Sequence, residues 1–272
     1  MKSELSFSVL MSLYGSESPS YFSEALSSIY NAQTLKPNQI VLVLDGPLPA
    51  QLLAEVVKAR ESLGSLLTIV ELPTNRGLAT ALNIGLEHCL NEWVFRMDTD
   101  DIALPNRFLV QANFLQAHPD IDVLGALMEE FDTADSSYSV VRRVPEKHED
   151  ITKYAKSRNP INHPVCCFKK TIVTQTGGYP VVYPEDYFLW VKLIQAGHRF
   201  HNLQEPLLKM RTGEAFIKRR GVNMLKGELN TYRYMRETGF INRKEFLVTA
   251  TLRAIIRIAP GWLKILAYKH LR

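Results

Sequence analysis

The sequence predicts an α/β fold in which helices flank a mainly parallel sheet, and three observations support this prediction. Short apolar runs alternate with helical patterns along the first half of the chain. Residues 39–44 are β-branched or leucine almost throughout, which is typical of a strand buried on both faces. Polar loops follow several of the expected strands, and a parallel sheet gathers such loops at one edge, where ligands bind.

The expected elements follow in order. We expect strands at residues 7–13, 39–44, 66–72 and 93–97, alternating with helices at 19–32, 52–63 and 77–90. Ser18 before Pro19 predicts an N-cap with a favoured first helical residue, and Gly64 stands where a C-terminal cap glycine belongs. Beyond Pro105 the expected elements are a helix to residue 117, strands at 122–131 and 138–144, helices at 149–157 and 187–195, and strand-like segments to 210.

Composition limits the class of protein. The chain has 272 residues, of which 46% are hydrophobic, enough for a substantial core. We interpret the apolar N-terminus as the first strand, because it has no basic segment or cleavage pattern typical of a signal peptide. Since no apolar stretch approaches the length of a membrane-spanning helix, we expect a cytoplasmic protein. Cys89, Cys166 and Cys167 fit neither a disulfide framework nor a zinc knuckle.

The charge is unevenly distributed. The net charge of +4 combines an acidic body with a basic C-terminal region, residues 214–272, which holds 13 Lys and Arg against 4 Asp and Glu. We therefore divide the chain into a catalytic domain, residues 1–213, and a basic, amphipathic helical region, residues 214–272. The surplus predicts an anionic partner for the second region. We do not expect nucleic acid, because no nucleic-acid-binding motif accompanies the charge.

The segment Asp98-Thr99-Asp100-Asp101 is the sharpest chemical feature. Its three carboxylates directly follow an apolar strand and would repel one another unless a cation neutralised them. Mg²⁺ and Mn²⁺ prefer oxygen ligands and bind through one or two carboxylates together with substrate phosphates. The alternative is a solvated acidic turn that caps the next helix.

Three further segments are candidates for the same site. Glu185 and Asp186 open a helix, where they either compensate the helix dipole or supply a general base that takes a proton from an attacking hydroxyl. Arg76 joins a strand to a helix and is either a phosphate-binding or a surface arginine. Asp45, after the second strand, is either a turn former or an acceptor for the N–H of a nucleotide base. The sequence contains no dinucleotide-binding glycine motif, P-loop or nucleophile elbow.

Taken together, the order of these motifs resembles bacterial family 2 glycosyltransferases with the GT-A fold, of the kind that build amylovoran-type exopolysaccharides and O-antigens. The resemblance covers residues 5–212. It rests on the joint order of Asp45-Gly46, Asn75-Arg76-Gly77, Asn83, Asp98-Thr99-Asp100-Asp101, Pro105-Asn106-Arg107, Gly177-Gly178-Tyr179 and Pro184-Glu185-Asp186.

The resemblance implies a role for each candidate residue. Asp45 matches the aspartate that contacts the base, usually uracil, and Arg76 a nucleotide-contacting arginine. Asp98 lies near the ribose or a metal-bound water, Asp100 is the metal ligand, and Asp186 is the catalytic base. On the acceptor side it places Glu185, Trp190 and, although a structural role is the first expectation for it, His163. Leu44 and Pro47 depart from the family pattern, in which an aspartate and a serine are common at these two positions.

The implied reaction is transfer, with inversion, from a nucleotide-diphosphate sugar, here a UDP-sugar, to a saccharide or a polyprenyl-diphosphate-linked saccharide. Two other functions stay open. A nucleotidyltransferase of similar architecture would need a glycine-rich basic loop after the first strand, which residues 12–17 do not supply. A membrane-associated scaffold without activity would need none of the four aspartates Asp45, Asp98, Asp100 and Asp186.

The C-terminal region carries a separate prediction. Arg253 and Arg257 lie one helical turn apart among aliphatic residues, and basic residues alternate with apolar ones again at 262–272. This pattern suits a helix at an anionic membrane surface, formed by residues 241–272, and would make the protein peripheral at the inner face of the cytoplasmic membrane. The alternative is a helix packed on the catalytic body with its charges solvated.

Overall fold

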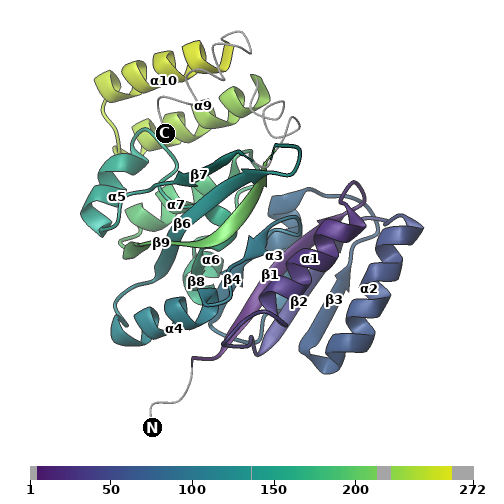
Figure 1. Ribbon diagram of the computed structural model, residues 1–272. Coiled ribbons are helices and arrows are strands. Elements are labelled where there is room, and N and C mark those ends of the chain that lie inside the picture. The colour runs from purple at the N-terminus through teal and green to yellow at the C-terminus, as the bar shows by residue number, and fades with distance from the viewer. Residues whose placement is uncertain (1–4, 136, 213–221, 259–272) are drawn as a thin grey trace.

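The computed structural model describes residues 5–135, 137–212 and 222–258 (Figure 1). Within them a mixed sheet has the strand order β3-β2-β1-β4-β8-β6-β9-β5, with β7 paired to β6. The strands are β1 Phe7–Tyr14, β2 Gln39–Asp45, β3 Leu67–Glu71, β4 Trp93–Arg96, β5 Ile102–Ala103, β6 Val123–Asp132, β7 Ser139–Arg142, β8 Cys167–Lys169 and β9 Phe200–Thr212. The α-helices are α1 Pro19–Ile29, α2 Ala50–Leu63, α3 Leu78–His88, α4 Arg107–Ala117, α5 His148–Ala155, α6 Lys170–Gln175, α7 Glu185–Gln195, α9 Val222–Glu237 and α10 Arg243–Ile258.

The predicted parallel arrangement holds for the first half of the sheet only. Strands β1 to β4 pair in parallel, as their alternation with helices requires. In the second half, β8 runs antiparallel to both β4 and β6. Strand β5 pairs antiparallel with β9, and β7 pairs antiparallel with β6. Only β6 and β9 add a further parallel pair there. The expected α/β fold with helices flanking the sheet is confirmed, and antiparallel pairs enter the second half of the sheet because the connections after β4 return strands in both directions.

Helices cover both faces of the sheet, which explains why its central strands are apolar throughout. One core packs alternate residues of β1 and β2, such as Val9 and Leu42, against α1, α2 and α4. The other packs the intervening residues, such as Leu10 and Val43, against α3, α6 and α7. Gly85 lets α3 approach closely, since a Cβ there would lie 2.5 Å from the Leu10 side chain.

The predicted helix caps have different outcomes. Gly64 caps α2 with a φ of +53° and donates its N–H to the Arg60 carbonyl, as expected of a terminal glycine. Ser18 occupies the N-cap position of α1, but its side chain makes no capping hydrogen bond. Its hydroxyl lies 2.9 Å from the Ser20 hydroxyl instead. The predicted position of the N-cap at Ser18 is therefore confirmed, but the predicted capping hydrogen bond from its side chain is absent.

The C-terminal helices pack on the body of the molecule. Helices α9 and α10 lie together beside α5 and α7 (Figure 1), and Tyr232 and Met235 of α9 share a small core with Tyr187 and Val191 of α7. At Gly227 the contact is so close that a Cβ would lie 1.2 Å from the Tyr183 carbonyl oxygen. None of the helices formed by the described residues is long and apolar enough to cross a membrane. The expected basic segment at residues 262–272 lies outside the described part of the chain.

Candidate active site

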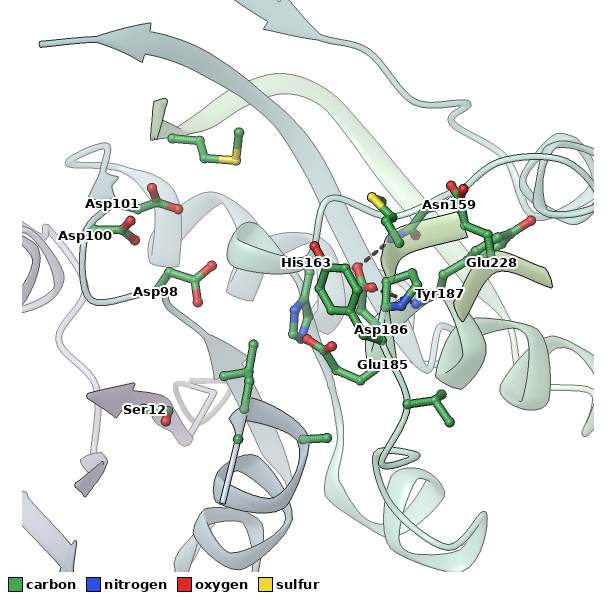
Figure 2. A pocket seen from close by; sticks show the side chains of 18 of the residues that line it. Ser12, Asp98, Asp100, Asp101, Asn159, His163, Glu185, Asp186, Tyr187 and Glu228 are labelled. Carbon is green, nitrogen blue, oxygen red and sulfur yellow. Dashed lines mark hydrogen bonds between the residues drawn. The ribbon is translucent and has the colours of Figure 1, made fainter. Parts of the chain in front are cut away.

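A cleft of about 930 Å³ opens at the carboxyl ends of β1, β2 and β4 and extends past the start of α7 to α9 and α10. It thus lies at the edge of the sheet where ligands bind in proteins with parallel strands. Figure 2 shows Asp98, Asp100 and Asp101 on one side, with Glu185, Asp186 and His163 across from them and Glu228 farther along. Of the predicted site residues, the cleft is lined by Asp45, Arg76, Asp98, Asp100, His163, Glu185 and Asp186.

Asp98 is held in place by an ion pair with a buried arginine. Arg96, the last residue of β4, is fully buried, and its guanidinium forms an ion pair with the Asp98 carboxylate. The same guanidinium donates to the carbonyls of Leu10 and Met97. Asp98 itself keeps 31% of its side chain exposed to the cleft. Its carboxylate is therefore oriented by Arg96 while remaining accessible to a ligand.

Arg211 of β9 fixes the rest of the acidic loop. Its backbone N–H donates to Asp101 Oδ1 at 2.9 Å, and its Nε donates to the Asp100 carbonyl at 2.9 Å. Burial, followed by the charges of Asp100 and Asp98, raises the pKa of the Asp101 carboxyl well above its ordinary value. Asp101 thus shapes the loop, and Asp98 and Asp100 are left to face the cleft.

The chemistry of this loop fits a hard divalent cation. All its candidate ligands are carboxylate oxygens, and the buried Asp101 Oδ2 finds no hydrogen-bond partner among the described residues. Those residues contain no cluster of three or more His, Cys, Asp or Glu side chains that could enclose a metal. Mg²⁺ is commonly held by only one or two carboxylates, the remaining ligands being water and phosphate. Asp98 and Asp100 therefore suit a metal that is bound together with a diphosphate.

Asp45 organises the turn that carries Arg76. Its Oδ1 accepts the Arg76 N–H at 2.7 Å and its Oδ2 accepts the Gly77 N–H at 3.0 Å, directly before α3. Gly46 follows with a φ of +89°, and a Cβ there would lie 2.5 Å from the Asn75 nitrogen. The Asp45 carboxylate therefore has a structural role that the sequence alone did not show, at the place where a nucleotide base is expected.

Glu185 and Asp186 face the cleft from the first turn of α7. Asp186 accepts hydrogen bonds from Asn159 Nδ2 at 2.5 Å and from the Tyr187 N–H at 2.8 Å. Burial raises the pKa of Asp186, although both hydrogen bonds act to lower it. Burial, followed by the charge of Asp186, raises the pKa of Glu185 to about 7. A carboxylate that is oriented on two sides and has a raised pKa suits a general base.

His163 and Trp190 take different places. His163 lines the cleft, and its Nε2 lies 3.0 Å from the Tyr179 hydroxyl. Burial, followed by the charge of Arg96, lowers the pKa of His163 well below its ordinary value, so its imidazole is neutral. Trp190 is fully buried in the core and does not line the cleft, which corrects its expected place on the acceptor side. It lies behind His163, with 6.0 Å between the ring centroids.

Several residues that build the site were not predicted to do so. Asn83 of α3 accepts the Tyr179 N–H at 2.7 Å and donates to the Tyr179 carbonyl at 2.8 Å, which ties the Gly177-Gly178-Tyr179 segment to α3. The sequence signalled a role for Asn83 only through its place among the motifs shared with family 2 glycosyltransferases. Asn159 and Arg211 gave no signal, because their partners Asp186 and Asp101 are distant in sequence. Arg96 gave none because it ends an apolar strand.

The charges in the cleft are sorted into two ends. The acidic end comprises Glu17, Asp45, Asp98, Asp100 and Asp101, accompanied by Arg76 and Arg211. The basic end comprises Arg142, Arg143, Arg158, Arg253 and Arg257, accompanied by Glu228. Glu185 and Asp186 lie between the two ends, and the charge of Arg142 acts on Asp186.

Comparisons with known proteins agree with this architecture. The model of glycosyl transferase family 2 matches residues 8–175. The amylovoran biosynthesis glycosyltransferase AmsE of Erwinia amylovora is 39% identical over 259 residues, which are 93% of this chain and 94% of that protein. The UDP-Gal:α-D-GlcNAc-diphosphoundecaprenol β-1,3-galactosyltransferase of Escherichia coli is 34% identical over 269 residues, which cover 97% and 95% of the two chains.

Solved structures share the fold at low sequence identity. The mannosyltransferase PcManGT from Pyrobaculum calidifontis, in complex with GDP-Man and Mn²⁺, gives a TM-score of 0.65 at 17% identity, with 99% of this chain and 81% of that chain covered. TarS of S. aureus, in complex with UDP-GlcNAc, gives 0.63 at 20% identity, with 96% and 69% covered. The GT-A fold expected from the motifs is therefore confirmed, and the chain belongs to glycosyl transferase family 2.

Proposed function

We propose that this glycosyltransferase moves a sugar from a UDP-sugar, with inversion, to a hydroxyl of a saccharide carried on a lipid diphosphate, during synthesis of a cell-surface polysaccharide. The observation that carries the proposal is the single cleft shared by Asp98 and Asp100 with Asp186. The curated relatives support the acceptor class, since one is named for an exopolysaccharide and another for a diphosphoundecaprenol-linked sugar.

The arrangement separates donor from acceptor. Asp45 and Arg76 lie where the nucleotide would bind, and Asp98 and Asp100 lie where its diphosphate would bind with Mg²⁺ or Mn²⁺. A bound divalent cation would neutralise charge on the leaving diphosphate. Asp186, across the cleft, would take the proton of the attacking hydroxyl. One base opposite one leaving group gives a single displacement, which inverts the anomeric centre.

A screen of nucleotide sugars tests this proposal. The protein would be incubated with each donor and a lipid-diphosphate-linked saccharide, with Mn²⁺, with Mg²⁺ or with a chelator, and the products analysed by mass spectrometry and NMR. We expect cation-dependent transfer from one UDP-sugar and an inverted linkage. Release of pyrophosphate would indicate a nucleotidyltransferase instead, and retention of configuration would contradict the assigned role of Asp186.

We also propose that an anionic membrane surface contacts the outer face of α10. Arg253 and Arg257, expected to face the membrane, point toward the body instead: Arg253 donates to Tyr232 and Ser157, and Arg257 pairs with Glu228. The outer face carries the exposed apolar side chains Leu247, Val248, Leu252 and Ile255 together with Lys244. An apolar helix face with a basic residue suits shallow insertion among anionic lipids.

Vesicle flotation tests the membrane contact. The variant Leu247→Glu/Leu252→Glu should lose binding to phosphatidylglycerol vesicles that the unmodified protein shows. The matched control is Leu53→Glu/Val57→Glu, which removes two exposed apolar residues from α2, on another part of the surface. If both variants float like the unmodified protein, α10 is not the membrane contact.

A further inference from the structure

The basic end of the cleft is assembled from three separate parts of the chain. Arg142 ends β7 and Arg143 follows it, Arg158 follows α5, and α10 supplies Arg253 and Arg257. No single stretch of sequence holds this cluster. Tertiary packing brings these five arginines to the lining of one cleft.

Two of these arginines are fixed in position by internal contacts. Arg257 forms two hydrogen bonds with the Glu228 carboxylate, at 3.1 and 2.8 Å, and both side chains are about 5% exposed. Arg253 donates to the Tyr232 hydroxyl at 3.2 Å and to the Ser157 carbonyl at 2.7 Å. Arg253 and Arg257 therefore hold fixed positions within the cluster. Arg143 and Arg158 are its exposed members.

We propose that the basic end binds the diphosphate of the acceptor, next to the sugar whose hydroxyl meets Asp186. This inference rests on the proposed function and assigns residues to a substrate group for which the acidic end is unsuitable. Guanidinium groups bind phosphate oxygens directly through paired N–H donors. The acidic end, by contrast, repels a phosphate unless a cation is bound. The two ends thus sort two diphosphates, that of the donor and that of the acceptor.

Position distinguishes this role from binding of lipid headgroups. The five arginines line the interior of the cleft, and Arg253 and Arg257 project from the side of α10 that packs on the body. The opposite side of α10 is the apolar face described above. A flat bilayer would meet that outer face, whereas a diphosphate on a single lipid can enter the cleft and reach the arginines.

A binding experiment with a charge-reversal variant tests the inference. The probes are an α-GlcNAc-diphosphate ester of a short alkyl chain, the matching alkyl glycoside without phosphate, and UDP with Mn²⁺, each titrated by calorimetry. Arg143→Glu/Arg158→Glu should bind the diphosphate ester at least about tenfold more weakly, since charge-assisted hydrogen bonds to phosphate are lost. Binding of UDP and of the glycoside should not change. Arg233→Glu, an exposed α9 arginine outside the cleft, is the control.

The possible outcomes separate this inference from the proposed function. Unchanged binding of the diphosphate ester, or an equal loss for the phosphate-free glycoside, would overturn the inference even if sugar transfer is observed. Loss of binding to phosphatidylglycerol vesicles with the diphosphate ester still bound would reassign the arginines to the membrane. Selective loss of the diphosphate ester, without detectable transfer by the unmodified protein, would support the inference and count against the proposed function.

Discussion

At the acidic end of the cleft the charged groups come mainly from turns that follow β1, β2 and β4, whereas at the basic end they come from β7, the turn after α5, and α10. Among the acidic groups, Asp45 accepts two N–H groups from the turn before α3, Asp98 pairs with the Arg96 guanidinium, and Asp101 accepts the Arg211 N–H. At the basic end, Arg253 and Arg257 are held by groups of other segments, as when Arg257 pairs with Glu228 of α9.

The difference suggests a way in which one cleft would bind two anionic substrates at separate places. Under the two proposals above, a diphosphate would reach the acidic end together with a cation, while the basic end would accept a diphosphate directly. Glu185 and Asp186 lie at the junction, where both substrates would approach them. Changes at one end should therefore leave binding at the other end intact, and the predictions below test this independence.

The largest effect is expected from Asp100→Ala. Transfer should fall by about a thousandfold or more, because charge stabilisation by a bound metal contributes several kcal/mol to the transition state. Binding of UDP should lose its dependence on Mn²⁺, as measured by calorimetry with and without a chelator. Acceptor binding should be unchanged. Asp150→Ala, which removes an exposed acid of α5, is the control. Cation-dependent UDP binding by the Asp100 variant would contradict the assignment.

Asp186→Asn should lower turnover at least about a hundredfold, the range found for general bases, while UDP binding persists. The pH profile gives a second readout. Because the pKa of Asp186 is raised by burial, the proton-accepting carboxylate is present only above that raised pKa. The rate of the unmodified enzyme should therefore fall on acidification at a higher pH than for an ordinary aspartate. Normal turnover in the variant would exclude Asp186 as the base.

Gly227→Ala should disturb the basic end alone. A Cβ would collide with the Tyr183 carbonyl, directly before the α7 carboxylates, so α9 must shift. We expect a loss of about 1–3 kcal/mol in the free energy of unfolding, typical of overpacking, and weaker acceptor binding with unchanged UDP binding. Chemical denaturation and calorimetry measure the two effects. Lys226→Ala, at an exposed neighbouring position, is the control. Equal losses for donor and acceptor would show that the ends are coupled.

The sequence predicted the acidic end well because its information is local. The pattern of an apolar strand followed by Asp98-Thr99-Asp100-Asp101 places those carboxylates at the sheet edge whatever the rest of the chain does. Helix α7 and its first two acids were predictable for the same reason. The direction of β8 was not, since a strand of three residues carries no signal for its pairing partner.

The basic end could not be predicted, because it depends on contacts between distant segments. Arg253 and Arg257 alternate with aliphatic residues, a pattern that equally suits a membrane-facing helix, and only the partners Ser157 and Glu228 show that they face inward. Arg211 likewise meets Asp101 across 110 positions. Trp190 was misplaced because a motif gives a residue's neighbours in sequence but not the side of the helix that it occupies.

Glu185→Gln should have the smallest effect, and the sign depends on pH. Burial raises the pKa of Glu185 from 4.5 to about 7, so the folded protein holds a proton more tightly than the unfolded chain. That contribution to stability is complete below pH 4.5 and is lost as the pH rises through 7. Glutamine stays neutral at every pH, so the variant should gain on the order of 1–2 kcal/mol over the unmodified protein at pH 8 and almost nothing at pH 4.5.

Thermal unfolding in the presence of a chelator measures this difference at the two pH values, with Glu205→Gln, an exposed glutamate of β9, as the control. A gain confined to high pH would show that the junction between the two ends resists a second negative charge beside Asp186. An equal gain at both pH values would instead mean that the substitution improves packing, and that Glu185 is ionised in the folded protein. In that case Glu185 would count among the ionised carboxylates of the acidic end, and Asp186 alone would lie at the junction.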